Sequence, residues 1–307
     1  MTRAVVFAYH NVGVRCLAVL LAHGIEVALV VTHDDSPGEN IWFESVASLA
    51  RLQGVEAVAP ADPNAPGFVA RLSTLRPEFL FSFYYRHMLS PAVLATASRG
   101  AFNMHGSLLP KYRGRVPVNW ALVHGERETG ATLHEMVEKP DAGRIVDQQA
   151  VPILPNDTAR EVFGKVTVAA EMVLERSVPR LVAGTAALRA QNLTQGSYFG
   201  GRTPADGRID LTRDAWSVHN LVRAVAPPYP GAFTLVAGAE LRILRTFWNG
   251  RRDATLAQPS LFVHAGALWL RCADGGVLRV LEAELAGEPL DAENLPSRFP
   301  SGAILLT

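Results

Sequence analysis

Residues 101–115 read AFNMHGSLLPKYRGR, an apolar run that passes into a polar loop. The run predicts a buried strand on which Asn103 and His105, two positions apart, share one face. Gly106 and Pro110 then end the strand and begin a basic loop. Because open α/β sheets place their sites at the carboxyl ends of buried strands, a functional site is expected here.

An amide and an imidazole in this arrangement fit acyl transfer to an amine. The imidazole can take a proton from the amine near neutral pH, and an amide N–H can stabilise the oxygen that gains charge. Asp141 lies in a turn-like segment, residues 139–143, and can fold back to orient His105. An amine acceptor removes the need for a serine or cysteine nucleophile. The alternative interpretation is a hydrogen-bonded core pair, the commoner role of Asn and His at this spacing.

Strands and helices alternate over the first part of the chain. Apolar runs predict strands at residues 4–8, 25–32, 55–58, 79–83, 131–136 and 145–152. Helical periodicity predicts helices at residues 14–23, 43–53, 68–75, 118–124 and 157–181. The alternation predicts a Rossmann-like, mostly parallel α/β sheet. The first strand–helix turn lacks G-x-G-x-x-G, so a dinucleotide is not indicated.

The character of the sequence changes after about residue 190. A helix is predicted at 215–224, followed by short strands at 232–236, 241–244, 261–264, 268–272 and 277–284. The turn ADGG at 273–276 predicts a hairpin, and short strands around tight turns predict a small β-barrel. We therefore expect a catalytic domain over residues 1–190, a linker over 191–202 and a carboxy-terminal domain over 203–307.

The composition of the chain argues against several classes of function. The chain has 307 residues, balanced acidic and basic counts, and only two cysteines, Cys16 and Cys272, which are not in a metal-binding spacing. Zero net charge gives no support for broad nucleic-acid binding. No apolar run has the length of a membrane span, and the start has no signal-peptide layout. We expect a cytoplasmic protein with buried, reduced thiols and no membrane insertion.

A longer pattern surrounds the Asn–His pair. It begins NMHGSLLPKYRG at Asn103 and continues with Pro117, Trp120, Gly125, Thr129, Gly130, Thr132, Met136, Asp141 and Gly143. The pattern resembles the signature of the folate-dependent formyltransferases, a family that includes methionyl-tRNA formyltransferases and nucleotide-sugar N-formyltransferases. This resemblance covers nearly the whole chain. It implies an OB-like carboxy-terminal domain, N10-formyltetrahydrofolate as co-substrate and no metal.

The resemblance also implies roles for individual residues. Asn103 would stabilise the oxyanion, His105 would act as general base and then as general acid, and Asp141 would orient His105. The folate pocket would be formed by His87, Met88, Leu89, Arg115, Val137, Glu138, Lys139, Pro140 and Asp141. The simpler interpretation of His87 and Arg115 is that both are solvated surface residues.

Within the family, the chain is similar to the formyltransferase domains of bifunctional polymyxin-resistance proteins. The similarity rests on residues 5–10 (VVFAYH), 81–87 (FSFYYRH), 106–115 (GSLLPKYRGR) and 223–233 (RAVAPPYPGAF). It implies N-formylation of UDP-4-amino-4-deoxy-L-arabinose, as in lipid A modification. The second, decarboxylase domain of those proteins is absent from this sequence. Either a separate or fused decarboxylase partner supplies that activity, or this is an excised domain.

The UDP end of such a substrate needs cationic or backbone donors for the diphosphate and a flat contact for uracil. Arg202 and Tyr229 are the candidates, although a connector arginine and a turn tyrosine are often only structural. A dTDP-linked amino sugar is an open alternative. Mixed charges after residue 191 disfavour methionyl-tRNA. A folate-binding regulatory module without turnover would not need the base. A homo-oligomer is also left open.

Overall fold

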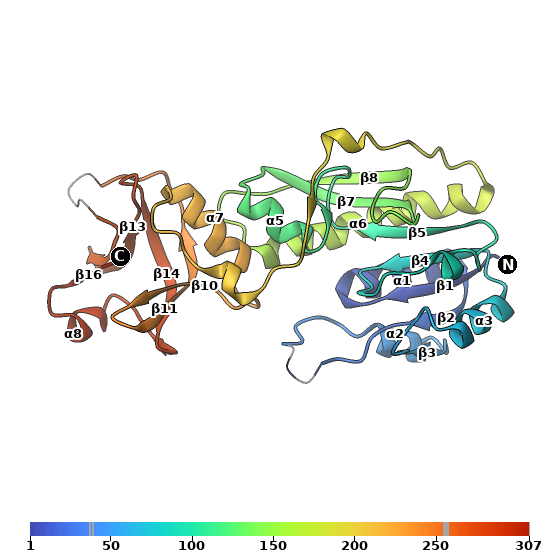
Figure 1. Ribbon diagram of the computed structural model, residues 1–307, viewed down its shortest axis with the longest axis horizontal. Helices are drawn as coiled ribbons and strands as arrows, with labels where there is room; N and C mark the ends of the chain where they lie inside the picture. The colour runs from blue at the N-terminus through green and yellow to red at the C-terminus, as the bar shows by residue number, and fades with distance from the viewer. Residues whose placement is uncertain (37, 39, 254–257, 307) are drawn as a thin grey trace. The chain divides into compact units, whose positions relative to one another are not determined.

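The computed structural model describes residues 1–36, 38, 40–253 and 258–306 (Figure 1). It divides into two compact units, which are described separately below. The first unit comprises Met1–Pro117, Thr129–Val151 and Gly164–Gly200, and the second comprises Val118–Glu128, Pro152–Phe163 and Gly201–Thr307. The split at residues 200 and 201 falls in the stretch that the sequence suggests as a linker. The assignment of catalytic, linker and carboxy-terminal domains stays a prediction.

The first unit is built on a seven-stranded sheet in the order β3-β2-β1-β4-β5-β7-β8. Its strands are β1 (Arg3–Ala8), β2 (Glu26–Val31), β3 (Ala57–Val58), β4 (Phe79–Phe83), β5 (Gly100–His105), β7 (Glu128–Glu135) and β8 (Ile145–Pro152). The pairs β3–β2, β2–β1, β1–β4 and β4–β5 are parallel, whereas β5 and β7 are antiparallel. The predicted Rossmann-like, mostly parallel α/β sheet is confirmed.

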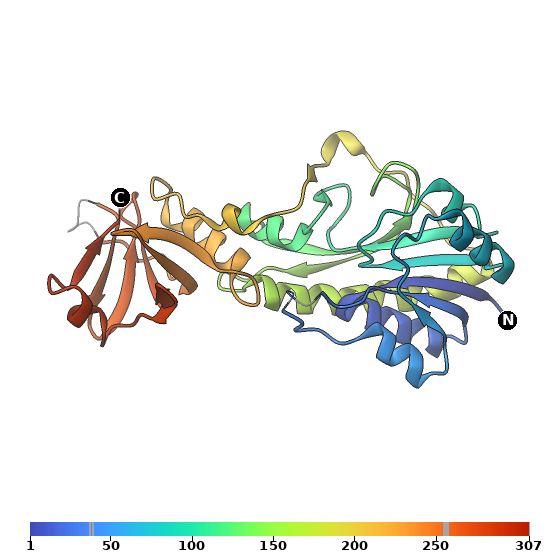
Figure 2. The same cartoon turned by 60° about the horizontal axis from the view of Figure 1, so that its bottom comes forward.

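The helices of the amino-terminal part lie where the periodicity places them, with shifted ends, except for the short α4, which was not predicted. They are α1 (His10–Ala22), α2 (Val46–Leu52), α3 (Pro66–Leu75), α4 (Pro91–Leu94), α5 (Pro117–Val123) and α6 (Ala159–Ala183). Helix α1 packs against β1, β2, β4 and α2 (Figure 2). It begins four residues earlier than predicted. The polar Asn11 belongs to the helix and accepts a hydrogen bond from the Glu44 N–H at 2.8 Å, a contact that sequence does not show.

The core of the first unit explains why its strands form without strict alternation of apolar and polar residues. One cluster of buried side chains contains Val5, Phe7, Leu29, Val31, Leu72, Leu80, Val93 and Ala101. Strand β4 is buried at every position, as expected for a parallel strand covered on both faces. A rigid, fully buried β4 fixes the position of its neighbour β5, which carries Asn103 and His105.

The second unit contains a curled antiparallel sheet in the order β10-β11-β14-β13-β12-β16, with β15 paired to β14. The strands are β10 (Ala232–Val236), β11 (Ala239–Phe247), β12 (Ser260–His264), β13 (Ala267–Arg271), β14 (Val277–Leu285), β15 (Glu288–Pro289) and β16 (Ala303–Leu305). The predicted hairpin turn closes with a hydrogen bond of 2.9 Å from the Cys272 N–H to the Gly276 carbonyl. The small carboxy-terminal β unit is thereby confirmed.

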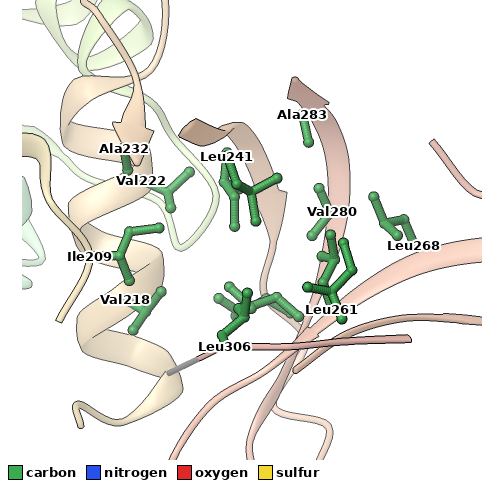
Figure 3. Packing of buried hydrophobic residues seen from close by; sticks show 14 of the residues in the cluster. Ile209, Val218, Val222, Ala232, Leu241, Leu261, Leu268, Val280, Ala283 and Leu306 are labelled. Atoms are coloured by element: carbon green, nitrogen blue, oxygen red, sulfur yellow. The ribbon is translucent and has the colours of Figure 1, made fainter. Parts of the chain in front are cut away.

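Helix α7 (Ala215–Val225) covers one side of this sheet and contacts β10, β11 and β14. Figure 3 shows Val218 and Val222 of the helix facing Leu241 of β11, with Val280 of β14 beyond it. This apolar layer holds the unit together. None of the described helices in either unit has the length and hydrophobicity needed to cross a lipid bilayer.

Candidate active site

Strand β5 ends in the polar pair that the sequence singles out. Asn103 is half-buried, and His105 is 6% exposed. Behind them, the loop of residues 106–112 is tied to β7, because Thr132 donates to the Ser107 carbonyl at 2.6 Å and accepts from the Leu109 N–H at 3.2 Å. The loop therefore has a fixed path around the imidazole.

The His105 ring has a defined tautomer. Its Nε2 lies 2.8 Å from the Tyr112 carbonyl oxygen, which can only accept, so Nε2 carries the hydrogen. Its Nδ1 lies 3.6 Å from Oδ1 of Asp141. In the neutral ring the lone pair is therefore on Nδ1. This nitrogen can take a proton, and the proton would then face a carboxylate.

Asp141 lies where the sequence anticipates, folded back on the imidazole. Its Oδ2 accepts the Gly114 N–H at 2.9 Å, and the Gln191 side chain holds the turn by donating to the carbonyls of Asp141 and Gly143 at 2.9 and 2.7 Å. Burial alone would raise the pKa of this carboxyl. The charge and hydrogen bonding of the His105 and His134 rings in their protonated forms, together with the Gly114 N–H, outweigh burial and hold the pKa well below its usual range. Asp141 is consequently ionised at any working pH.

His134 is a site residue that sequence reasoning missed. It lies on β7 directly opposite Asn103 and is 1% exposed. Its Nε2 is 3.2 Å from Nδ2 of Asn103 and 3.5 Å from Oδ1 of Asp141. The signal available in the sequence was a histidine within the predicted buried strand 131–136. The pairing that brings it to Asn103 was not readable, because β7 is antiparallel to β5.

Residues 197–199, in the predicted linker, hold the loop that carries the basic residues after β5. Strand β6 (Arg113–Gly114) pairs with β9 (Tyr198–Phe199) in a short parallel ribbon. The Tyr112 ring stacks on Phe199 with centroids 5.5 Å apart, and the Tyr112 N–H donates to Ser197 Oγ at 2.8 Å. Residues near 197–199 thus belong to the structure around the site, although the sequence suggests only a linker there.

The residues that the resemblance assigns to a folate pocket lie on loops of the first unit. His87, Met88 and Leu89 follow β4, the parallel neighbour of β5. Leu89 packs against the core, whereas Met88 is 61% exposed and its carbonyl accepts from the Asn64 side chain at 2.9 Å. His87 contacts the His33 ring at 4.9 Å.

The remaining assigned pocket residues precede Asp141 or follow the basic loop. Val137 is 43% exposed, Glu138 and Lys139 are exposed, and Pro140 is half-buried. Arg115 is exposed, and its backbone N–H donates to the Phe199 carbonyl at 2.9 Å. Met88 and Val137 are two of the exposed large apolar side chains of the described residues. The assignment to folate remains a prediction.

An aromatic cluster lies where the strand order of the sheet reverses, between β1 and β4. Tyr9 contacts His33 and Phe43 at centroid distances of 5.3 and 5.0 Å, and His33 stacks on Tyr85 at 4.2 Å. The Arg86 guanidinium lies 4.5 Å from the Tyr9 ring. Open α/β sheets bind ligands at such a reversal point. Sequence reasoning missed the cluster because its members come from separate loops.

Arg202 and Tyr229, proposed for the nucleotide, lie in the second unit. The Arg202 guanidinium is 4.7 Å from the Trp120 ring and donates to the Asp206 carbonyl at 2.7 Å. Burial lowers its pKa, and Asp206 partly offsets this. Tyr229 packs against the core of the unit, with its hydroxyl on Asn119, and burial raises its pKa. Their role in substrate binding stays a prediction.

The described residues offer few groups for nucleophilic catalysis or metal binding. Cys16 and Cys272 are buried free thiols. Burial raises the pKa of both, that of Cys272 to about 12, so neither is a thiolate at neutral pH. Within the described residues, no group of three or more His, Cys, Asp or Glu is arranged to hold a metal ion. The groups placed for chemistry are thus an amide, two imidazoles and a carboxylate.

This arrangement can remove a proton from an amine and stabilise an oxyanion, as acyl transfer requires. A family profile described as formyl transferase matches residues 10–178, and one described as formyl transferase, C-terminal domain, matches residues 202–299. The chain belongs to the formyl transferase family. The formyltransferase prediction is confirmed at that level.

Several solved structures share this fold. The N-formyltransferase from Helicobacter canadensis, solved with folinic acid and dTDP-3-aminofucose, is 20% identical over 91% of this chain and 99% of that one, with a TM-score of 0.73. WlaRD, a sugar 3N-formyl transferase solved with dTDP and 5-N-formyl-THF, is 19% identical over 91% and 97%, with a TM-score of 0.68. Glycinamide ribonucleotide transformylase 1 from Symbiobacterium toebii is 22% identical over 62% and 95%, with a TM-score of 0.53.

Proposed function

We propose that the protein transfers the formyl group of N10-formyltetrahydrofolate to the 4-amino group of UDP-4-amino-4-deoxy-L-arabinose. The observation that carries the reaction is the grouping of Asn103, His105 and Asp141 at the end of β5 in a formyl transferase domain. The choice of sugar rests on the similarity of residues 5–10, 81–87, 106–115 and 223–233 to enzymes with that substrate.

The geometry supports a specific proton path. The sugar amine attacks the formyl carbon, and the carbonyl oxygen that becomes negative accepts an N–H of the Asn103 amide. The amine proton passes to Nδ1 of His105, where the new N–H faces the ionised Asp141. As the bond between the formyl carbon and N10 of the folate breaks, His105 returns the proton to N10. The ring is then ready for another cycle.

The loops after β4 and β7 suit the folate. Met88 and Val137 offer exposed apolar surface for the flat pterin ring, and the nearby loop backbone offers donors and acceptors for its polar edge. The Helicobacter canadensis enzyme and WlaRD were solved with folinic acid and 5-N-formyl-THF. A folate co-substrate in this chain is consistent with those relatives.

The nucleotide is assigned to Arg202 and Tyr229. The Nε of Arg202 is buried without a hydrogen-bond partner. A buried donor left unpaired is costly, and a diphosphate oxygen would satisfy it. Tyr229 is only partly buried and offers a flat face for uracil. The aromatic cluster of Tyr9, His33, Phe43 and Tyr85 is the competing surface for a base.

A dTDP-linked amino sugar is the second candidate, because the Helicobacter canadensis enzyme and WlaRD, which have a similar fold, were solved with dTDP compounds. Parallel assays with formyltetrahydrofolate separate the possibilities. We expect turnover with UDP-4-amino-4-deoxy-L-arabinose, weaker turnover with a dTDP-4-amino sugar and none with initiator methionyl-tRNA. The rate should change little between about 50 and 200 mM salt, where a polyanion-binding protein loses affinity by orders of magnitude. Preferred use of the dTDP sugar, or formylated methionyl-tRNA at low salt, would overturn the choice of acceptor.

A further inference from the structure

His134 has a hydrogen-bond pattern that defines which of its nitrogens carries hydrogen. Its Nδ1 lies 2.7 Å from the carbonyl oxygen of Glu135. A carbonyl oxygen only accepts, so Nδ1 is the protonated nitrogen. In the neutral ring, Nε2 is then a pure acceptor, and it faces the Asn103 amide at 3.2 Å.

This pattern in turn orients the amide. Asn103 presents either its NH₂ or its oxygen to His134, and only the NH₂ can pair with a nitrogen lone pair. One N–H of Asn103 is consumed by His134, and the second remains for an oxyanion. Turning the amide over would place two acceptors together at this contact. It would also bring the amide oxygen, which cannot stabilise negative charge, toward the substrate side.

We propose that His134 is a positioning residue that, as the neutral tautomer with hydrogen on Nδ1, orients the amide of Asn103 for oxyanion stabilisation. The inference rests on the proposed role of Asn103. It also explains how two histidines share one carboxylate. The neutral His134 has no hydrogen to give Asp141, whose Oδ1 is 3.5 Å from Nε2, so Asp141 is left to stabilise a proton on His105.

A proton on His134 would reverse both effects. Nε2–H would repel the Asn103 NH₂ and donate to Asp141, in competition with His105. The charged and titratable groups around the ring are Asp141, His105 with its centroid 6.4 Å away, and the neighbouring Glu135, whose carboxylate is paired with Arg144 at 2.6 Å. Because Glu135 is already paired with a cation, Asp141 is the carboxylate left to stabilise a protonated His134.

The tautomer can be measured without any sugar substrate. Two-bond ¹H–¹⁵N correlation spectra of the histidine-labelled full chain distinguish the three ring states, and the signal of His134 is the one lost in His134→Gln. We expect a protonated Nδ1 and an unprotonated Nε2 at neutral pH. A ring protonated on Nε2, alone or together with Nδ1, would overturn the proposal regardless of which acceptor the enzyme uses.

Kinetics tests the coupling to Asn103. An oxyanion donor that is misplaced loses much of its stabilisation of the transition state. His134→Leu should therefore lower kcat about 10- to 100-fold with little change in KM. His134→Gln keeps an acceptor oxygen and should stay within about threefold of wild type. In an Asn103→Ala background, His134→Leu should cost less than about twofold more, because there is no amide left to orient.

An equal loss from His134→Leu in both backgrounds would show that the ring acts on Asp141 or on folding instead, and would refute the proposal. Thermal unfolding of each variant identifies a folding defect. The rates are measured with whichever of the two nucleotide amino sugars turns over. If neither does, the proposed function fails while the tautomer measurement still decides the geometry.

Discussion

At the scale of single residues, the site depends on two backbone carbonyls. The Tyr112 carbonyl fixes the hydrogen of His105 on Nε2, and the Glu135 carbonyl fixes that of His134 on Nδ1. The period-two spacing of Asn103 and His105 predicted that they share a face. It could not predict which ring nitrogen is free, because that depends on a loop conformation in which Tyr112 has a positive φ of 55°. Nor could it reveal His134, which pairs with Asn103 only through the antiparallel register.

The contact between His105 and Asp141 gives a residue-scale prediction. Asp141→Asn keeps the size of the side chain but removes the negative charge from beside Nδ1, so the protonated imidazole is less stable. Turnover should fall by about 10- to 100-fold, which is part of the about 10²- to 10⁴-fold that a general base contributes. The acid limb of the pH–rate profile should move to lower pH. Turnover measured across pH checks this. An unchanged profile would show that Asp141 does not act on the imidazole of His105.

A second residue-scale prediction concerns stability in acid. Burial is the main cause that lowers the pKa of His219 from 6.5 to about 4, and Arg223 lowers it further, while the bond to the Pro155 carbonyl opposes the shift. The ring is therefore neutral in the folded state and gains a proton on unfolding below pH 6.5. The stability it contributes at neutral pH is lost as pH falls from 6.5 to about 4, by up to about 3 kcal/mol.

Urea unfolding of the full chain at pH 7 and near pH 4 measures this loss. His219→Gln is the matched variant, since an amide can keep both hydrogen bonds, to Thr246 and to Pro155, without titrating. The free energy of unfolding should depend less on pH in the variant than in the wild type. Equal pH dependence in both proteins would mean that His219 is not the group responsible.

At the scale of elements, apolar runs were sufficient to predict β4, β8 and β10 with the observed bounds. Long-range pairing was not predictable. Strands β6 and β9 have only two residues each, and nothing in their composition identifies them as strands. Their pairing turns part of the expected linker into a support for the loop that carries Tyr112 and Gly114.

The β6–β9 ribbon gives the element-scale prediction. Gly114 has a φ of 97°, and a Cβ there would collide with the Phe199 carbonyl. Its N–H also holds Asp141. Gly114→Ala should therefore destabilise the fold by about 1–3 kcal/mol and lower turnover as well. Thermal unfolding and the transfer assay test this.

Gly67→Ala in helix α3 is the control for this substitution, because a Cβ at that position meets no atom within 4 Å and the backbone there is unstrained. It should leave turnover unchanged. A Gly114→Ala variant as active and stable as Gly67→Ala would show that the ribbon does not hold the loop in solution.

At the scale of the whole molecule, the sequence was informative about fold and family because many positions act together. A strand with Asn and His at its end, a basic loop and a distant Asp-x-Gly recur as one pattern, and the family profiles match both parts of the chain. The identity of the acceptor substrate is not predictable in the same way. It depends on a few side chains whose positions follow from loop packing, such as Arg202 against Trp120, and the sequence alone does not order these contacts.

The central claim is that His105 moves the proton in formyl transfer. The most direct test compares His105→Ala with wild type for turnover of formyltetrahydrofolate with the nucleotide amino sugar, and for folate binding by calorimetry. Turnover should fall by about 10²- to 10⁴-fold while folate binding stays nearly intact, because the substitution removes proton transfer and leaves the loops after β4 and β7 in place. A variant that keeps more than about a third of wild-type turnover at neutral pH would contradict the account.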